Sequence, residues 1–142
     1  MQTEPLDIYE AFIKNKEKLE KNNCVVKGLR KKRDLLDSIF TFGMSVIVSL
    51  IFMRKINDIN AQPKLFPKSF VKYMKNFPND FSLDLFFIII ASINNFKIIN
   101  YDVIMKKRVY GEAKGGGSIS GKFKLIKRTM IYILKLRIKL WK

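Results

Sequence analysis

The first segment with a clear alternation of apolar and polar positions covers residues 5–21. Its apolar residues Ile8, Phe12 and Leu19 fall on one side of a helix, and its acidic residues precede its lysines, which suits the direction of the helix dipole. The pattern predicts an amphipathic helix that ends at Asn22–Asn23.

A second helix is predicted over Val25–Leu36, and it contains four consecutive basic residues, Arg30–Arg33. A run of charges of this kind is either solvated or in contact with phosphate groups. The sequence leaves both interpretations of this run open.

Two longer apolar runs follow. The uncharged run 38–53 would reach about 24 Å as a helix, against roughly 30 Å for the hydrocarbon core of a bilayer. A buried strand over 45–53 and a tightly fitting transmembrane helix are therefore alternatives. The uncharged run Leu85–Phe96 has the length of a buried strand. A short helix is expected at 69–75, in a stretch punctuated by proline, and an extended segment at 97–105.

From Lys122 to Lys142 the sequence predicts a helix with two distinct faces, one for a core and one for phosphates. At 100° per residue, five basic residues fall within about 60° of one another, and large apolar residues cluster on the far side. The basic face comprises Lys124, Arg128, Lys135, Lys139 and Lys142, and the apolar face comprises Phe123, Ile126, Met130, Ile133, Leu134 and Trp141. Because apolar and basic residues alternate over Leu134–Leu140, a strand at this end is an alternative.

The composition adds a strong positive charge to this pattern. The chain has 142 residues, and its 28 Lys and Arg against 12 Asp and Glu give a formal net charge of +16. Residues 103–142 hold 12 of the basic residues and a single acidic one, Glu112. This balance is typical of a protein that binds a polyanion, either nucleic acid or an anionic membrane surface, through its C-terminal part. The length allows one domain and a short extension.

The chain has no histidine and one cysteine, Cys24. Ser/His and Cys/His catalytic pairs, histidine-ligated metal sites and an internal disulfide are thereby excluded. We expect no enzymatic activity, no metal and no cofactor. Residues 116–122 satisfy the P-loop pattern GxxxxGK, but Phe123 stands where a P-loop needs Ser or Thr to hold Mg²⁺. A glycine turn whose amides approach nucleic-acid phosphates and launch a basic helix is the favoured interpretation, and an ordinary surface loop is the alternative.

The glycine-rich segment carries a resemblance to a known family. Residues 114–121, which read Lys-Gly-Gly-Gly-Ser-Ile-Ser-Gly, and the following Lys122 and Ile126–Lys127 resemble the signature of the ninth protein of the small ribosomal subunit, the universal S-nine family. That signature is a triple-glycine turn, then Ile-Ser-Gly-Gln, then a helix with Ile-Arg at the fourth and fifth positions after the Gln. Here Lys122 replaces the Gln, and Ser118 is inserted after the glycines.

The resemblance continues upstream in order and residue class. Tyr101–Ile104 resembles the strand that leads to the glycines, and Lys68–Tyr73 resembles the family's short helix. Val46–Phe52 would be its first core strand, and Leu85–Ile93 lies where the family has another strand. The long basic tail of family members has no counterpart after Trp141, so the role of that tail is not carried over.

The resemblance implies an α+β fold, a small sheet with packed helices. In this fold 1–44 is a helical N-terminal extension, and 45–142 is a small RNA-binding domain that ends in the basic helix. It implies a structural constituent of a small ribosomal subunit whose partners are ribosomal RNA and neighbouring ribosomal proteins, with no small-molecule substrate. The abundance of Phe, Ile, Lys, Asn and Tyr, 68 of 142 residues, indicates an AT-rich genome, such as that of a protist or an organelle, and the ribosome we expect is mitochondrial. The expected RNA-binding residues are Lys114, Gly115, Gly116, Gly117, Lys122, Lys124, Lys127, Arg128, Lys135 and Lys139, with Lys106, Lys107 and Arg108 as second-tier candidates.

A membrane protein is the competing hypothesis. In it the chain is a small accessory subunit of a mitochondrial inner-membrane complex, with 38–53 as a transmembrane segment and the C-terminal helix on anionic lipid headgroups. This hypothesis accounts for the apolar runs but gives the triple glycine no role.

Overall fold

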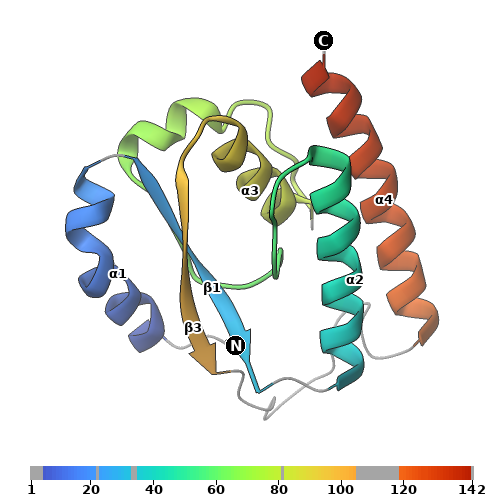
Figure 1. Ribbon diagram of the computed structural model, residues 1–142, viewed down its shortest axis with the longest axis horizontal. Helices are drawn as coiled ribbons and strands as arrows, with labels where there is room; N and C mark the ends of the chain where they lie inside the picture. The colour runs from blue at the N-terminus through green and yellow to red at the C-terminus, as the bar shows by residue number, and fades with distance from the viewer. Residues whose placement is uncertain (1–4, 22, 33–34, 81, 105–118, 142) are drawn as a thin grey trace.

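The computed structural model describes residues 5–21, 23–32, 35–80, 82–104 and 119–141. The chain is a small α+β fold that begins with a helix, as the sequence predicts (Figure 1). In order, its elements are α1 (Pro5–Glu20), β1 (Cys24–Lys31), α2 (Leu35–Phe52), β2 (Lys64–Leu65), the 3₁₀ helix η1 (Lys68–Tyr73), α3 (Leu83–Ile93), β3 (Lys97–Ile104) and α4 (Ile119–Trp141).

The sheet has the strand order β2-β1-β3, so β1 is the central strand. β1 runs parallel to β3 over its whole length, from Cys24 opposite Lys97 to Lys31 opposite Ile104. On its other side β1 pairs antiparallel with the two residues of β2. Two parallel strands must be joined by a long crossover connection. Between β1 and β3 this connection comprises α2, β2, η1 and α3.

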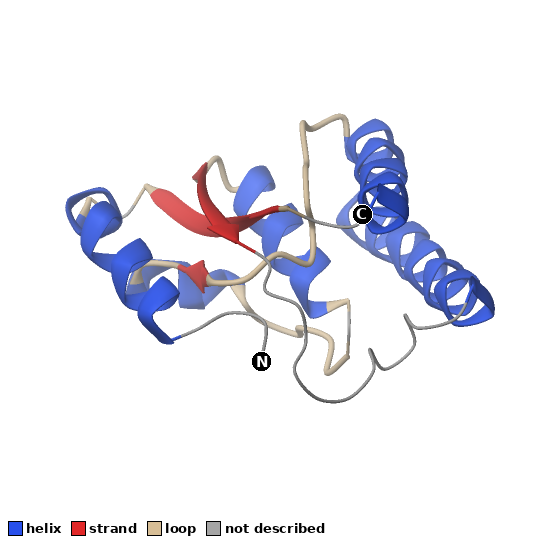
Figure 2. Ribbon diagram, turned by 90° about the horizontal axis from the view of Figure 1, so that it is seen from below, coloured by secondary structure: helices blue, strands red, loops and turns tan. Residues whose placement is uncertain are grey.

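Helices cover both faces of the sheet, with α1 on one side and α2, α3 and α4 on the other (Figures 1 and 2). The two faces hold separate cores. Val26 packs with Leu19 of α1 in the smaller core, whereas its neighbour Val25 packs with α3 in the larger one. The larger core also holds a cluster of aromatic rings, in which the centroids of Phe70 and Phe87 lie 5.0 Å apart. The alternation of Val25 and Val26 is what a strand buried on both faces requires.

The helix predicted over Val25–Leu36 is wrong, because Cys24–Lys31 forms a strand. Its first five residues are all buried, since helices lie against both of its faces. The segment therefore lacks the apolar and polar alternation of a half-exposed strand. The β-branched pair Val25 and Val26 was the local signal for a strand.

The strands expected in the two apolar runs are also wrong. Residues 38–53 fall largely in helix α2, and Leu83–Ile93 is helix α3. All residues from Leu85 to Ala91 are buried, so α3 is apolar on every side, and a short run of this kind does not reveal its period. Among the described residues, no helix is both long and apolar enough to cross a membrane.

Other predicted elements are present close to their expected limits. Residues 97–104 are extended, a short 3₁₀ helix covers 68–73, and the C-terminal segment is helical rather than a strand. The first helix buries a different side from the one expected: Leu19 is buried, but Ile8 and Phe12 are exposed. Its buried residues are Ala11, Asn15 and Leu19, four residues apart.

The residues expected as an N-terminal extension, 1–44, contribute α1, the central strand β1 and the first part of α2. The expected boundary at residue 44 lies inside α2, and the pairing of β1 with β3 joins the two segments in one sheet.

Candidate nucleic-acid interface

The way α4 packs on the rest of the molecule decides which of its sides faces solvent. Ile133 and Leu136 are buried in the larger core, and Met130, Tyr132 and Leu140 pack against it. Met130, Ile133, Leu136 and Leu140 lie three or four residues apart, so they form one side of the helix, and Tyr132 lies at the edge of this side. α4 lies beside α2 at one end of the molecule (Figure 1).

Away from this packed side, α4 carries a line of cations. Lys124, Arg128, Lys135 and Lys139, here named the basic stripe, are all exposed. They fall within about 60° of the helix circumference and extend over about 22 Å. Within the described part of the chain, the three lysines of the stripe form no ion pair with an acidic side chain. Lys127 is exposed beside the stripe. The prediction that Lys124, Arg128, Lys135 and Lys139 lie on one exposed side of a helix is confirmed, and Lys142, the fifth residue of the predicted basic face, lies outside the described residues.

Seven of the other expected interface residues lie outside the described residues: Lys106, Lys107, Arg108, Lys114, Gly115, Gly116 and Gly117. Lys122 lies in α4, but its side chain is not among those the structure describes. The structure therefore brings together the helical half of the predicted interface and leaves the glycine turn untested.

The apolar side predicted for this helix is correct in part. Ile133 is buried, and Ile126 and Met130 are partly buried. Phe123 and Leu134 are exposed by 61% and 52%, although both were assigned to the core. They lie at the edge of the predicted apolar side, where the angular pattern alone does not decide between core and solvent.

Arg30, the first residue of the basic run Arg30–Arg33, has a structural role that the sequence did not reveal. The side chain of Arg30 at the end of β1 forms a salt bridge with Asp58, which lies in the loop after α2. Arg30 Nε donates to Asp58 Oδ1 at 2.9 Å, and the backbone N–H of Arg30 donates to Asp58 Oδ2 at 2.8 Å. Both side chains are largely buried, at 15% and 7% exposure. Arg30 is therefore neither solvated nor available to phosphate, and both interpretations of the run are wrong for this residue.

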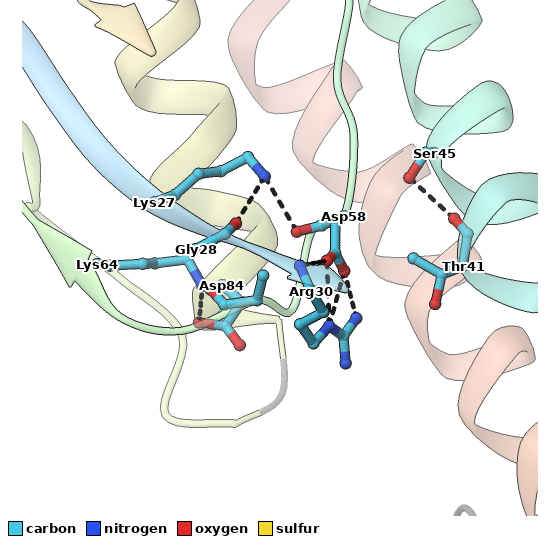
Figure 3. A network of polar contacts seen from close by, with 9 residues as sticks. Lys27, Gly28, Arg30, Thr41, Ser45, Asp58, Lys64 and Asp84 are labelled. Carbon is cyan, nitrogen blue, oxygen red and sulfur yellow. Dashed lines mark hydrogen bonds and ion pairs between the residues drawn. The ribbon is translucent and has the colours of Figure 1, made fainter. Parts of the chain in front are cut away.

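A second cation of β1 is buried in the same region (Figure 3). Lys27 is only 1% exposed, and its Nζ donates to the backbone oxygens of Gly28 and Asp58 at 3.2 and 3.3 Å. Removal from water lowers the pKa of Lys27 to about 8, although the charge of Asp58 opposes the change. Its partner in the β1–β2 register, Lys64, also has a lowered pKa because it is buried, and its Nζ donates to Asp84 Oδ1 at 2.6 Å.

These buried lysines predict a stability that increases with pH between about pH 8 and 10. The unfolded chain holds the Lys27 proton up to a pKa of 10.5, whereas the folded chain loses it near 8, so the unfolded state binds more protons in this window. The trend should begin to weaken near pH 9, because burial raises the pKa of the Cys24 thiol from its ordinary value of 9.0. It should weaken further above pH 10, because burial and then the charge of Asp80 raise the pKa of Tyr132 to about 12. From urea unfolding, the free energy of unfolding should be greater by about 2 kcal/mol at pH 9.5 than at pH 7.5.

Lys27→Met is the variant that checks this assignment. It should show a smaller rise over the same interval, because only Lys64 would then contribute in the same direction. An undiminished rise in Lys27→Met would mean that other groups cause it.

Comparisons with family models, with curated proteins and with solved structures found no match. The function is therefore inferred from the residues, their charges and the fold.

Proposed function

We propose that this chain is a non-catalytic, RNA-binding structural protein of the small subunit of a mitochondrial ribosome. The observation that carries the proposal is the basic stripe: Lys124, Arg128, Lys135 and Lys139 are exposed in one line on a helix whose other side is fixed in the core. A row of cations on a rigid helix is suited to the phosphate backbone of RNA, because it neutralises charge without reading bases.

The fold supports a role in positioning rather than in catalysis. α4 is attached to the larger core through Ile133 and Leu136, so the basic stripe is held in one orientation. The excess of basic residues in 103–142 adds long-range attraction toward a polyanion. RNA in a double-stranded region is recognised mostly through its shape and its backbone, which this arrangement suits.

In this proposal, the assignment to the small ribosomal subunit comes from the resemblance to the S-nine family. Two elements that it implies, an extended segment at Tyr101–Ile104 and a short helix at Lys68–Tyr73, are present, and α4 starts at Ile119, within the glycine-rich segment 114–121. Two others, the strands implied at Val46–Phe52 and Leu85–Ile93, are helices. The choice of the small ribosomal subunit therefore depends mainly on residues 114–127, and the RNA-binding role depends on the basic stripe.

Sedimentation of a tagged chain from a mitochondrial extract of the source organism tests the proposal. The chain should move with the monosome and shift to the small-subunit fraction when EDTA separates the subunits. Lys124→Glu combined with Lys135→Glu should remove most of the chain from that fraction. The matched control, Lys21→Glu combined with Lys75→Glu, changes the net charge equally at exposed lysines outside α4 and should behave like the unaltered chain.

The same variants have a quantitative readout with RNA extracted from the particle. The slope of log Kobs against log salt concentration is negative for a protein that binds phosphates. Loss of two phosphate contacts should make this slope less steep by about 1.5. Migration with a detergent-bound complex that ignores EDTA, or equal effects of the two double variants, would contradict the proposal.

A further inference from the structure

The side of α2 that faces away from the core carries a line of large apolar side chains. Leu35, Ile39, Phe42, Val46 and Leu50, here named the α2 seam, are all exposed, and Leu35, Phe42 and Leu50 have exposures of 75%, 71% and 72%. At 100° per residue they fall within about 80° of the helix circumference, and they extend over about 22 Å. The core side of the same helix is occupied by Val48 and Phe52, which are buried.

The α2 seam differs from the other exposed apolar residues of the molecule. No charged residue occurs between Ser38 and Met53, so no charge of α2 interrupts the seam from Ile39 to Leu50. Exposed apolar residues of α1 are interspersed with lysines and glutamates, and those of α4 with lysines and arginines. A continuous apolar surface of this kind, left in water, promotes association, which makes the α2 seam a surface for contact with another molecule.

Gly43, which borders the seam beside Phe42, is a second and independent observation. A Cβ at this position would have no neighbouring atom within 4 Å, so no contact within the described chain requires glycine here. Glycine inside a helix lowers helix stability relative to alanine, and its usual benefit is close approach of another backbone. Because that approach does not come from the part of the chain that the structure describes, Gly43 points to an element of another molecule that crosses α2 at this residue.

The shape and charge of this surface favour a helix of a different protein. A narrow seam with apolar residues spaced three or four apart is the pattern of helix packing, whereas a helix that lies in a lipid surface has a wider apolar face. A second copy of this chain would bring two formal charges of +16 together. The ends of the seam are also basic: Lys32 precedes Leu35, and Arg54 and Lys55 follow Leu50 by a few residues, all of them exposed.

We propose that the α2 seam binds an amphipathic helix of another protein, which crosses closest at Gly43 and has acidic residues at both ends of its apolar side. The acidic ends would meet Lys32 at one end of the seam and Arg54 and Lys55 at the other. Residues near the middle of that helix are small or apolar. This contact is independent of the basic stripe, so loss of one function leaves the other intact.

Two substitutions in the tagged chain test the contact. Gly43→Ala should raise the melting temperature of the isolated chain by about 3 °C, because alanine favours the helix, yet it should reduce recovery of the chain in its native assembly. Phe42→Glu should leave the isolated chain folded and still bound to RNA, and it should reduce recovery in the assembly by about tenfold or more. The matched control is Phe77→Glu, at a phenylalanine that is 51% exposed outside the seam, and it should have no such effect.

Zero-length carbodiimide cross-linking of the purified native assembly identifies the occupant, because it joins lysines to carboxylates in direct contact. Lys32 and Lys55 should link to acidic residues at opposite ends of one helix in one other protein. Links between two copies of this chain would overturn the proposal. A Gly43→Ala variant that is more stable than the unaltered chain and is recovered normally in the assembly would also overturn it. Flotation of the isolated chain with anionic vesicles, if abolished by Phe42→Glu and unaffected by Phe77→Glu, would assign the seam to a lipid surface and also overturn it.

Discussion

Gly28→Ala is expected to destabilise the chain by about 3 kcal/mol or more and to leave little of it folded at 37 °C. Gly28 lies in the buried central strand β1, and its backbone N–H donates to the carbonyl oxygen of Pro63 at 2.8 Å. A Cβ added at Gly28 would overlap the backbone carbonyl of Gln62, with the carbonyl carbon at 2.6 Å. The added Cβ is fixed to the backbone of β1, and the atoms that it meets belong to the backbone of Gln62. Rotation of side chains therefore cannot relieve the overlap.

Gly43→Ala serves as the control for this prediction, because the same substitution on α2 meets open space and should stabilise the isolated chain. Urea unfolding followed by circular dichroism compares the two variants directly. Similar stabilities for both would mean that the segment around Gln62 moves away from β1 at little cost, and that the close approach does not constrain residue 28.

The amphipathic helices were the part of this fold that the sequence could predict. The first and last helices have apolar residues spaced three or four apart, with charges between them, so their period is visible in the sequence. Even there, the prediction of the buried side failed on α1, because the side that packs against the sheet is not the most apolar side of the helix. On α1 the small or polar residues Ala11 and Asn15 are buried, whereas Phe12 is 42% exposed.

The central elements could not be predicted because tertiary burial removes their periodicity. β1 is covered by helices on both faces, and it includes Lys27, a residue that sequence patterns assign to solvent. Only the structure reveals that the charge of Lys27 lies near Asp58, 31 residues further along the chain. In α3 no charged or polar residue interrupts the run from Leu85 to Ala91, in which every residue is apolar and buried. Such a run shows no helical period in the sequence.

The candidate interface was predictable where it depends on local geometry. The angular positions of Lys124, Arg128 and Lys135 follow from helix periodicity alone, and their exposure agrees with it. The α2 seam follows the same spacing and could have been found in this way. It was missed because the expectation of a strand at 45–53 hid the helical period.

The buried ion pair between Arg30 and Asp58 leads to the second large effect. Asp58→Asn should lower the free energy of unfolding by about 3 to 5 kcal/mol, because it leaves the guanidinium of Arg30 largely buried without its counter-charge. The asparagine keeps the size of the side chain, so the loss is one of charge and of strong hydrogen bonds rather than of packing. Because the two carboxylate oxygens accept from the backbone N–H and from the side chain of Arg30, and an amide has only one acceptor oxygen, the contact between the loop that carries Asp58 and the end of β1 should weaken.

The control for Asp58→Asn is the exposed pair between Lys31 and Asp102, whose nearest charged atoms lie 3.5 Å apart with side chains 50% and 65% exposed. Asp102→Asn should change stability by less than about 1 kcal/mol, because water already solvates both charges. A double-mutant cycle with Arg30→Met separates the terms: Arg30→Met combined with Asp58→Asn should cost less than the sum of the two single changes, since the charge that Asp58→Asn leaves unpaired is then absent. Additive effects in this cycle would mean that Arg30 and Asp58 stabilise β1 independently and that the ion pair does not hold the loop after α2 against the sheet.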